Sequence, residues 1–312
     1  MINGRTKPDS KGRCRIIFVL CLAVVSTFSA AGKPAVQDQD TQRKIVSDDF
    51  VKGRRQGRNH PNAKSRVASK SRRAYRLASN PVKQSERIAA GAPKQLGITI
   101  WRLRSARSGD SDRRALIREK GKGMVWVAER VESEAILRAG EYIRLTVESP
   151  SNGYLYVIDR DVLADGANGV AKLIFPWSGA DNRLAPGRLI DIPRQEDDPS
   201  YFTASLTSEN QVGELLTFIV TTNPLVVPVA DEALPVASKD VTEWERLWGG
   251  PTERYEMEGG AGAVWTLEEQ RAAAQRRRTQ LTRDDPAPQT VYRVYTSNGK
   301  GVLVNLQLKY RK

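Results

Sequence analysis

The stretch EYIRLTVESPSNGYLYVIDRD, residues 141–161, decides the fold that we expect for this chain. In its first half Ile143, Leu145 and Val147 alternate with polar residues, and this period of two is typical of a half-buried β-strand. Residues 151–153, Ser-Asn-Gly, are a turn signal, and apolar residues alternate again after it. The stretch therefore predicts two strands joined as a β-hairpin.

Similar strand-like runs extend in both directions from this stretch. They recur at intervals of about ten residues with Gly, Asn, Asp or Pro between them, which is the spacing of an antiparallel sandwich or barrel. The chain ends on a second expected hairpin, residues 291–297 with 302–310. The other expected strands are residues 96–104, 123–130, 171–177, 187–193, 201–206 and 213–222.

A helical signal interrupts the strands before the last hairpin. Asp240 with Glu243, and Thr266 with Glu269, have the spacing of a capping box. They predict two helices within an insertion at about residues 238–282. The fold class that we expect is therefore mainly β: an antiparallel β-sandwich-like domain with a small helical insertion before the last hairpin.

The N-terminus has the pattern of an export signal. Basic residues precede an apolar run at 16–31, and Ser29 and Ala31 fit the −3 and −1 positions of a signal-peptidase site. We expect residues 1–31 to be a signal peptide that sends the chain to the periplasm or the cell exterior. If the signal is not cleaved, the same run would anchor the chain, although it is shorter than the roughly 20 residues of a membrane span.

Cleavage after Ala31 would limit the chemistry that remains. Cys14 and Cys21 both lie in the signal, and His60 is the only histidine of the sequence. The mature chain would have no thiol, and its expected domain has no histidine. These counts argue against a cysteine hydrolase, a Ser–His triad and a Cys-ligated zinc site. We therefore expect a chain that is not an enzyme and has no cofactor and no metal site.

Residues 32–94 have the composition of a disordered basic linker before a β-rich domain at 95–312. Residues 1–94 hold 21 Lys and Arg against 6 Asp and Glu, whereas residues 95–312 hold 29 against 30. Large apolar residues are scarce in the linker, so burial cannot offset its ordering entropy. The linker is either a solvated spacer or a contact for anionic lipid, lipopolysaccharide or wall polymer. Nucleic acid is not expected, because aromatic residues for base stacking are nearly absent there.

The domain resembles a bacterial family of unknown function whose members share a YLYV–LIFP–GE pattern. The pattern is carried here by GYLYVIDRD at 153–161, LIFP at 173–176, DNRLAPGRLIDIP at 181–193 and GELLTFIVT at 213–221. The resemblance covers roughly residues 96–312. It implies an accessory β-domain of exported or membrane proteins, also found fused to caspase-like peptidase or kinase domains. It transfers no catalytic residue, because the matched elements are structural.

A few polar positions remain as candidate sites. Trp177, beside the loop that holds Asp181 and Asn182, is the candidate ligand contact for a glycan or a peptide. Three consecutive arginines near an expected helix end either complement the helix dipole or bind an anion. These candidate anion contacts are Arg276, Arg277 and Arg278.

Residues 159–170 resemble a short calcium-binding loop. Leu163 occupies one of its ligand positions, and Val170 stands where the final glutamate belongs. A hairpin turn at 165–169 is the better interpretation.

The function that we expect is that of an exported, non-enzymatic, envelope-associated interaction or accessory module. Its partner would be a protein or an envelope polymer. Two alternatives stay open: a carboxylate-dependent hydrolase and a polysaccharide-binding module. Acidic clusters such as residues 196–198 offer carboxylates, but spacing along the sequence does not define their separation in space.

Overall fold

The computed structural model describes residues 48, 50–56, 74–90, 92–107, 116–118, 125–274, 280–297 and 299–311. The predicted signal peptide of residues 1–31 lies outside the described residues, and so do His60 and the arginines at 276–278. Within the described ranges no helix is long and apolar enough to cross a membrane.

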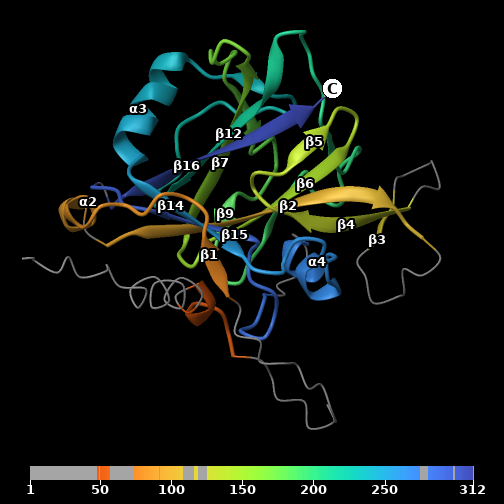
Figure 1. The fold of residues 1–312 in the computed structure, drawn as a ribbon, viewed down its shortest axis with the longest axis horizontal. Coiled ribbons are helices and arrows are strands. Elements are labelled where there is room, and N and C mark those ends of the chain that lie inside the picture. Colours follow the sequence, from red (N-terminus) through yellow and green to blue (C-terminus); the bar gives the residue numbers. More distant parts are fainter. Residues whose placement is uncertain are drawn as a thin grey trace, which may run out of the picture. The chain divides into compact units, whose positions relative to one another are not determined.

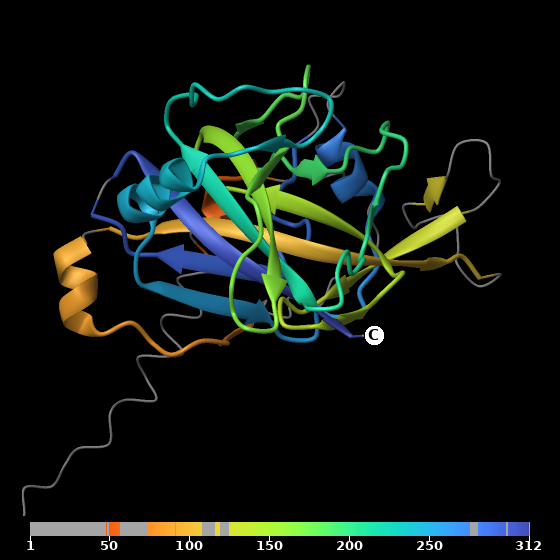
Figure 2. The same ribbon diagram turned by 90° about the horizontal axis from the view of Figure 1, so that it is seen from above.

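Two β-sheets form the body of the domain, as Figures 1 and 2 show. Strands account for 43% of the structure and helices for 12%, which confirms the expected mainly β, sandwich-like fold. The first sheet contains β1 (Tyr75–Leu77), β2 (Lys94–Ser105), β3 (Leu116–Arg118), β4 (Val125–Val131), β6 (Tyr142–Glu148), β10 (Ile190–Ile192), β11 (Phe202–Thr203), β14 (Thr252–Met257) and β15 (Thr290–Val294). The second contains β5 (Ile136–Arg138), β7 (Gly153–Leu163), β8 (Lys172–Phe175), β9 (Arg183–Leu184), β12 (Gln211–Thr221), β13 (Leu234–Pro235) and β16 (Gly301–Arg311).

The main core lies between the inner faces of the two sheets. Leu145 and Val147 of β6 contribute from the first sheet, and Val157 of β7 and Phe218 of β12 contribute from the second. All four side chains are at most 1% exposed. The alternation read from the sequence therefore marks the inner face of each strand.

Helices and connecting segments cover the outer face of each sheet. Helix α3 (Ser238–Trp248) packs its Val241 and Trp248 on the second sheet, and α4 (Leu267–Ala273) packs on the first. Because both faces of the central strands are covered, β7 is apolar on both sides, with Tyr156 and Ile158 beneath α3.

Neither expected hairpin forms. Strand β6 pairs with β2, β10 and β11, whereas β7 pairs with β8, β9 and β12, so the turn at 149–152 carries the chain from one sheet to the other. The last two strands do not pair with each other either, because β15 joins the first sheet and β16 pairs with β12 and β5 in the second. A turn between two alternating runs does not specify whether the runs pair with each other or with distant strands.

The predicted insertion at 238–282 contains more than helices. The capping box of α4 is confirmed, because Thr266 Oγ1 accepts from Glu269 N and Thr266 N donates to the Glu269 carboxylate. Helix α3 instead begins after Ala237, without a side-chain cap, so the cap predicted at Asp240 is wrong. Strand β14 lies between the two helices and extends the first sheet, where it pairs with β1 and β15.

Two segments of the predicted linker belong to the fold. Phe50 and Tyr75 are at most 1% exposed, in one apolar cluster on the first sheet. Strand β1 pairs with β14, and α2 (Gln84–Ala90) follows it. The prediction of a disordered linker over 32–94 therefore needs correction at 50–56, 74–90 and 92–94. The sequence pattern does not reveal these two segments, because a few isolated apolar residues are enough to attach a segment when they pack into an existing apolar cluster.

Gly213 provides a direct test of the second sheet. The register of β12 against β7 shifts beside it, and a Cβ at Gly213 would lie 2.0 Å from the carbonyl oxygen of Leu308. We expect Gly213→Ala to reduce the free energy of unfolding by about 1–3 kcal/mol, measured by urea denaturation. Gly299→Ala is the matched control, because a Cβ there meets nothing within 4 Å. Equal midpoints for the two variants would contradict this packing.

Candidate functional site

Three carboxylates gather at one end of the second sheet. Asp159 and Asp161 continue the inner face of β7, two and four residues beyond the core residue Val157. Glu214 lies on β12 directly opposite Asp161 in the strand register. All three side chains are partly buried. The inner face therefore changes from apolar to acidic where the main core ends.

The neighbours of this carboxylate cluster are polar but mostly uncharged. Gln211 Nε2 donates to Asp161 Oδ1 at 2.8 Å, and the hydroxyl of Tyr310 on β16 interacts with Glu214. Lys172 of β8 lies opposite Asp159 in the register and attracts its carboxylate. Among the described residues, the carboxylate cluster therefore has one lysine near it and no arginine paired with it.

Burial gives two of the carboxylates unusual proton affinities. Burial, reinforced by the charge of Asp161, raises the pKa of Asp159 to about 6. Burial and the charge of Asp159 raise the pKa of Glu214 to about 7, although the nearby hydroxyl of Tyr310 acts to lower it. Glu214 therefore exchanges its proton near neutral pH. Perturbed acids that lie close together are candidates for a functional role.

The arrangement is suited to proton transfer. A carboxyl group with a pKa near 7 can donate a proton at neutral pH, and a second carboxylate across the strand pair can accept one. Over the described part of the chain, no group of three or more Asp, Glu, His or Cys side chains has the geometry to hold a metal ion.

The calcium-like stretch that follows β7 forms a turn. Strands β7 and β8 pair antiparallel on either side of it, Asp165 Oδ1 accepts from Ala167 N at 2.9 Å, and Gly166 has φ +85°. The interpretation of residues 165–169 as a hairpin turn is confirmed.

The predicted ligand contacts take part in the fold. Trp177 is partly buried against the main core, with Phe175 edge-on to its ring at 5.2 Å and the Arg194 guanidinium 5.1 Å above it. Asn182 Nδ2 donates to the carbonyl oxygen of Leu155 at 3.0 Å. Asp181 pairs with Arg183 and Arg188 at 3.0 and 2.9 Å. Ligand contact by Trp177, Asp181 and Asn182 stays a prediction.

An open groove of about 370 Å³ lies beside β4 of the first sheet. Three glutamates line it, and each is paired with an arginine outside the groove: Glu132 with Arg76 at 2.7 Å, Glu134 with Arg254 at 2.8 Å, and Glu129 with Arg104. Its charges are already neutralised, so the carboxylate cluster on the second sheet is the stronger candidate.

The sequence contained one signal for the carboxylate cluster. Asp159 and Asp161 stand at positions where the alternation of β7 demands apolar residues, and Glu214 does the same on β12. Sequence alone does not show that these two strands are neighbours, so the three acids could not be grouped.

Comparison with known proteins found no match to a family, to a curated protein or to a solved structure.

The raised pKa of Glu214 predicts a pH-dependent stability. An acid whose pKa is higher in the folded than in the unfolded chain stabilises the fold below its unfolded pKa, and this stabilisation is lost as pH rises through its folded pKa. We expect the free energy of unfolding to fall between about pH 4.5 and pH 7. Glu214→Gln, which mimics the protonated acid, should be more stable than the wild type at about pH 8, by about 1–2 kcal/mol.

The measurement is urea denaturation at several pH values, with the exposed Glu232→Gln as control. The advantage of Glu214→Gln should vanish at about pH 4, where the wild-type acid is protonated as well. An advantage of the same size at both pH values would contradict the assignment.

Proposed function

We propose that this chain is an exported, non-enzymatic interaction module of the cell envelope. Its β-sandwich-like domain serves as a scaffold that presents a basic segment to an anionic partner. The partner class is anionic lipid, lipopolysaccharide or wall polymer. The export pattern of residues 1–31 and the family resemblance support the location, and the scaffold supports the mode of binding.

The observation that carries this proposal is the anchoring of the basic segment at both ends. Residues 57–73 contain six Lys and Arg and no Asp or Glu. Immediately before them Arg54 is buried in an ion pair with Glu148, and just after them β1 pairs with β14. The described residues on both sides of the basic segment, Arg54 and β1, therefore contact the first sheet, so a partner bound by the segment would be linked to the domain on both sides.

Not every basic residue of the predicted linker is available for a partner. Arg54, Arg76 and Arg87 are paired within the domain, with Glu148, Glu132 and Glu253 respectively. Attraction to an anionic surface contributes about 1 kcal/mol for each basic residue close to it. The six residues between the anchors are therefore the ones that the proposal requires.

Charge removal from this segment tests the proposal. In the test variant Arg58, Lys64, Arg66, Lys70, Arg72 and Arg73 are all changed to Gln. We expect its binding to phosphatidylglycerol vesicles, measured by co-sedimentation, to fall at least about tenfold, because roughly 1 kcal/mol is lost per charge. The matched control exchanges Lys and Arg at the same positions and should bind like the wild type. Retained binding by the Gln variant would contradict the proposal, as would equal binding to neutral vesicles.

The carboxylate cluster favours a second candidate, a carboxylate-dependent hydrolase. Glu214, with its pKa near 7, would be the general acid, and Asp161 on the neighbouring strand would be the general base. If this candidate is correct, a polysaccharide panel should yield new reducing ends, and Glu214→Gln or Asp161→Asn should each reduce the rate at least about 100-fold. Glu232→Gln is the control. The absence of turnover on every substrate, or unchanged turnover in both variants, would exclude the candidate for that panel.

A further inference from the structure

Arg54 lies in a pocket that satisfies its whole guanidinium group. Its Nε and Nη2 donate to the two carboxylate oxygens of Glu148 at 2.7 and 2.6 Å. Its Nη1 donates to the carbonyl oxygens of Thr282 and Asp285 at 3.3 and 3.1 Å, and Nη2 also donates to that of Pro286 at 3.0 Å. These five contacts match the five N–H donors of a guanidinium group. The domain surrounds Arg54 as a binding site surrounds a ligand.

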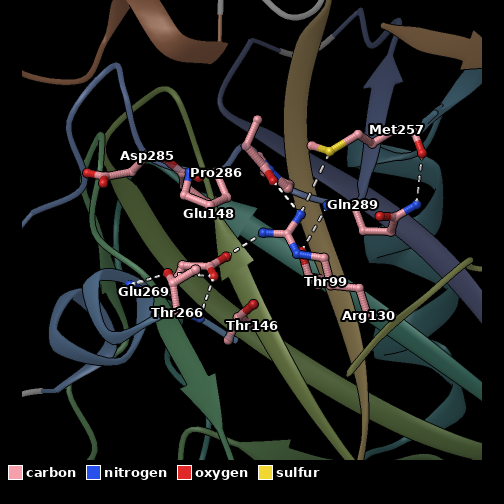
Figure 3. A network of polar contacts seen from close by, with 12 residues as sticks. Thr99, Arg130, Thr146, Glu148, Met257, Thr266, Glu269, Asp285, Pro286 and Gln289 are labelled. Atoms are coloured by element: carbon pink, nitrogen blue, oxygen red, sulfur yellow. Dashed lines mark hydrogen bonds and ion pairs between the residues drawn. The ribbon is translucent and has the colours of Figure 1, made fainter. Parts of the chain in front are cut away.

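The pocket requires a cation. The Glu148 side chain is 2% exposed, and Glu269 lines the same small cavity beside it. Figure 3 shows Glu269 paired with Arg130, which leaves Arg54 as the partner of Glu148. Without Arg54, a buried carboxylate would lie unpaired near a second carboxylate, which is strongly unfavourable. The planar guanidinium group of an arginine can donate to both Glu148 oxygens and to three carbonyl oxygens at once. The pocket therefore suits arginine better than lysine.

An aromatic residue four positions earlier enters a second pocket. Phe50 is 1% exposed, and a Cβ at Gly97 would lie only 2.7 Å from its ring, so the glycine makes room for it. Phe50 lies in a helical turn and Arg54 in the bend that follows it, and both side chains are at most 2% exposed. The buried residues that cluster with Phe50 are Tyr75, Tyr255, Ala287 and Val291.

The backbone of this segment belongs to neither sheet. Arg55 forms an isolated bridge with Thr282, and its carbonyl oxygen accepts from Arg283 N at 3.0 Å. Within residues 50–56 the structure contains no strand. The segment can therefore leave the domain without breaking a sheet ladder, provided that another guanidinium group replaces Arg54.

We propose that this face of the first sheet is a peptide-docking site for an aromatic residue followed four positions later by arginine, and that residues 50–54 occupy it as a resident ligand. A peptide of the same chemistry presented from outside competes with the resident segment for the two pockets. The site shares Arg54 with the proposed function, where it is one of two anchors of the basic segment, so exchange of residues 50–54 would leave that segment attached through β1 alone.

Exchange of the resident segment tests the proposal. A protease site is inserted between Lys64 and Ser65 of the full chain, which is folded first and then cleaved. A fluorescent peptide of residues 46–57, VSDDFVKGRRQG, is added in excess. We expect the peptide to displace the N-terminal piece and to bind, detected by fluorescence anisotropy and by release of that piece on gel filtration.

Peptide variants test whether both pockets contribute to peptide binding. They leave the sequence and fold of the receptor unchanged. The Arg54→Lys and Phe50→Ala peptides should each bind at least tenfold more weakly than the wild-type peptide. The Arg55→Ala peptide should bind as the wild type does, because Arg55 is exposed. If the N-terminal piece does not exchange, or if all four peptides bind equally, the proposal is wrong and the segment is a permanent part of the domain.

Discussion

The buried charges on the outer face of the first sheet are the constraint on which the rest of the structure depends. Arg144 and Glu148 of β6 alternate with core residues, yet both are at most 2% exposed because α4 and the N-terminal segment cover them. An unpaired buried charge costs about 3–5 kcal/mol, so whatever covers this face has to bring the opposite charge. Asp191 does so for Arg144, and Arg54 does so for Glu148 from 94 residues away. The covering segments are therefore selected by charge as well as by shape.

The two sheets treat buried charge in different ways. On the first sheet, Arg130 and Arg144 also lie over the rings of Trp101 and Trp265, so the paired charges are packed into an aromatic layer. At the end of the second sheet, Glu214 has the hydroxyl of Tyr310 and the carboxylate of Asp159 as neighbours. Pairing with arginine stabilises the charged form, whereas a neutral or like-charged neighbour does not. The first face therefore holds its charges in ion pairs, although burial still raises the pKa of Asp191 to about 6, whereas the carboxylates at the end of the second sheet lack an arginine partner among the described residues.

The docked N-terminal segment links these features to the proposed function. Because Arg54 and β1 hold the chain on both sides of residues 57–73, the basic charge that dominates the sequence is attached to the domain at two points. A tether joined at one point would leave the orientation of the domain free. Attachment at two points restricts the orientation in which the domain meets an anionic surface.

The sequence by itself determined the mainly β class, the inner face of β6 and the capping box of Thr266, because period-two alternation and capping are local. Only the tertiary structure decided that β6 and β7 belong to different sheets. A turn signal does not determine the strand with which each run pairs. The same holds for both sites. Glu214 meets Asp161, and Arg54 meets Glu148, through contacts between strands and segments far apart in the chain, and the physical partners of a charge are set by packing rather than by sequence spacing.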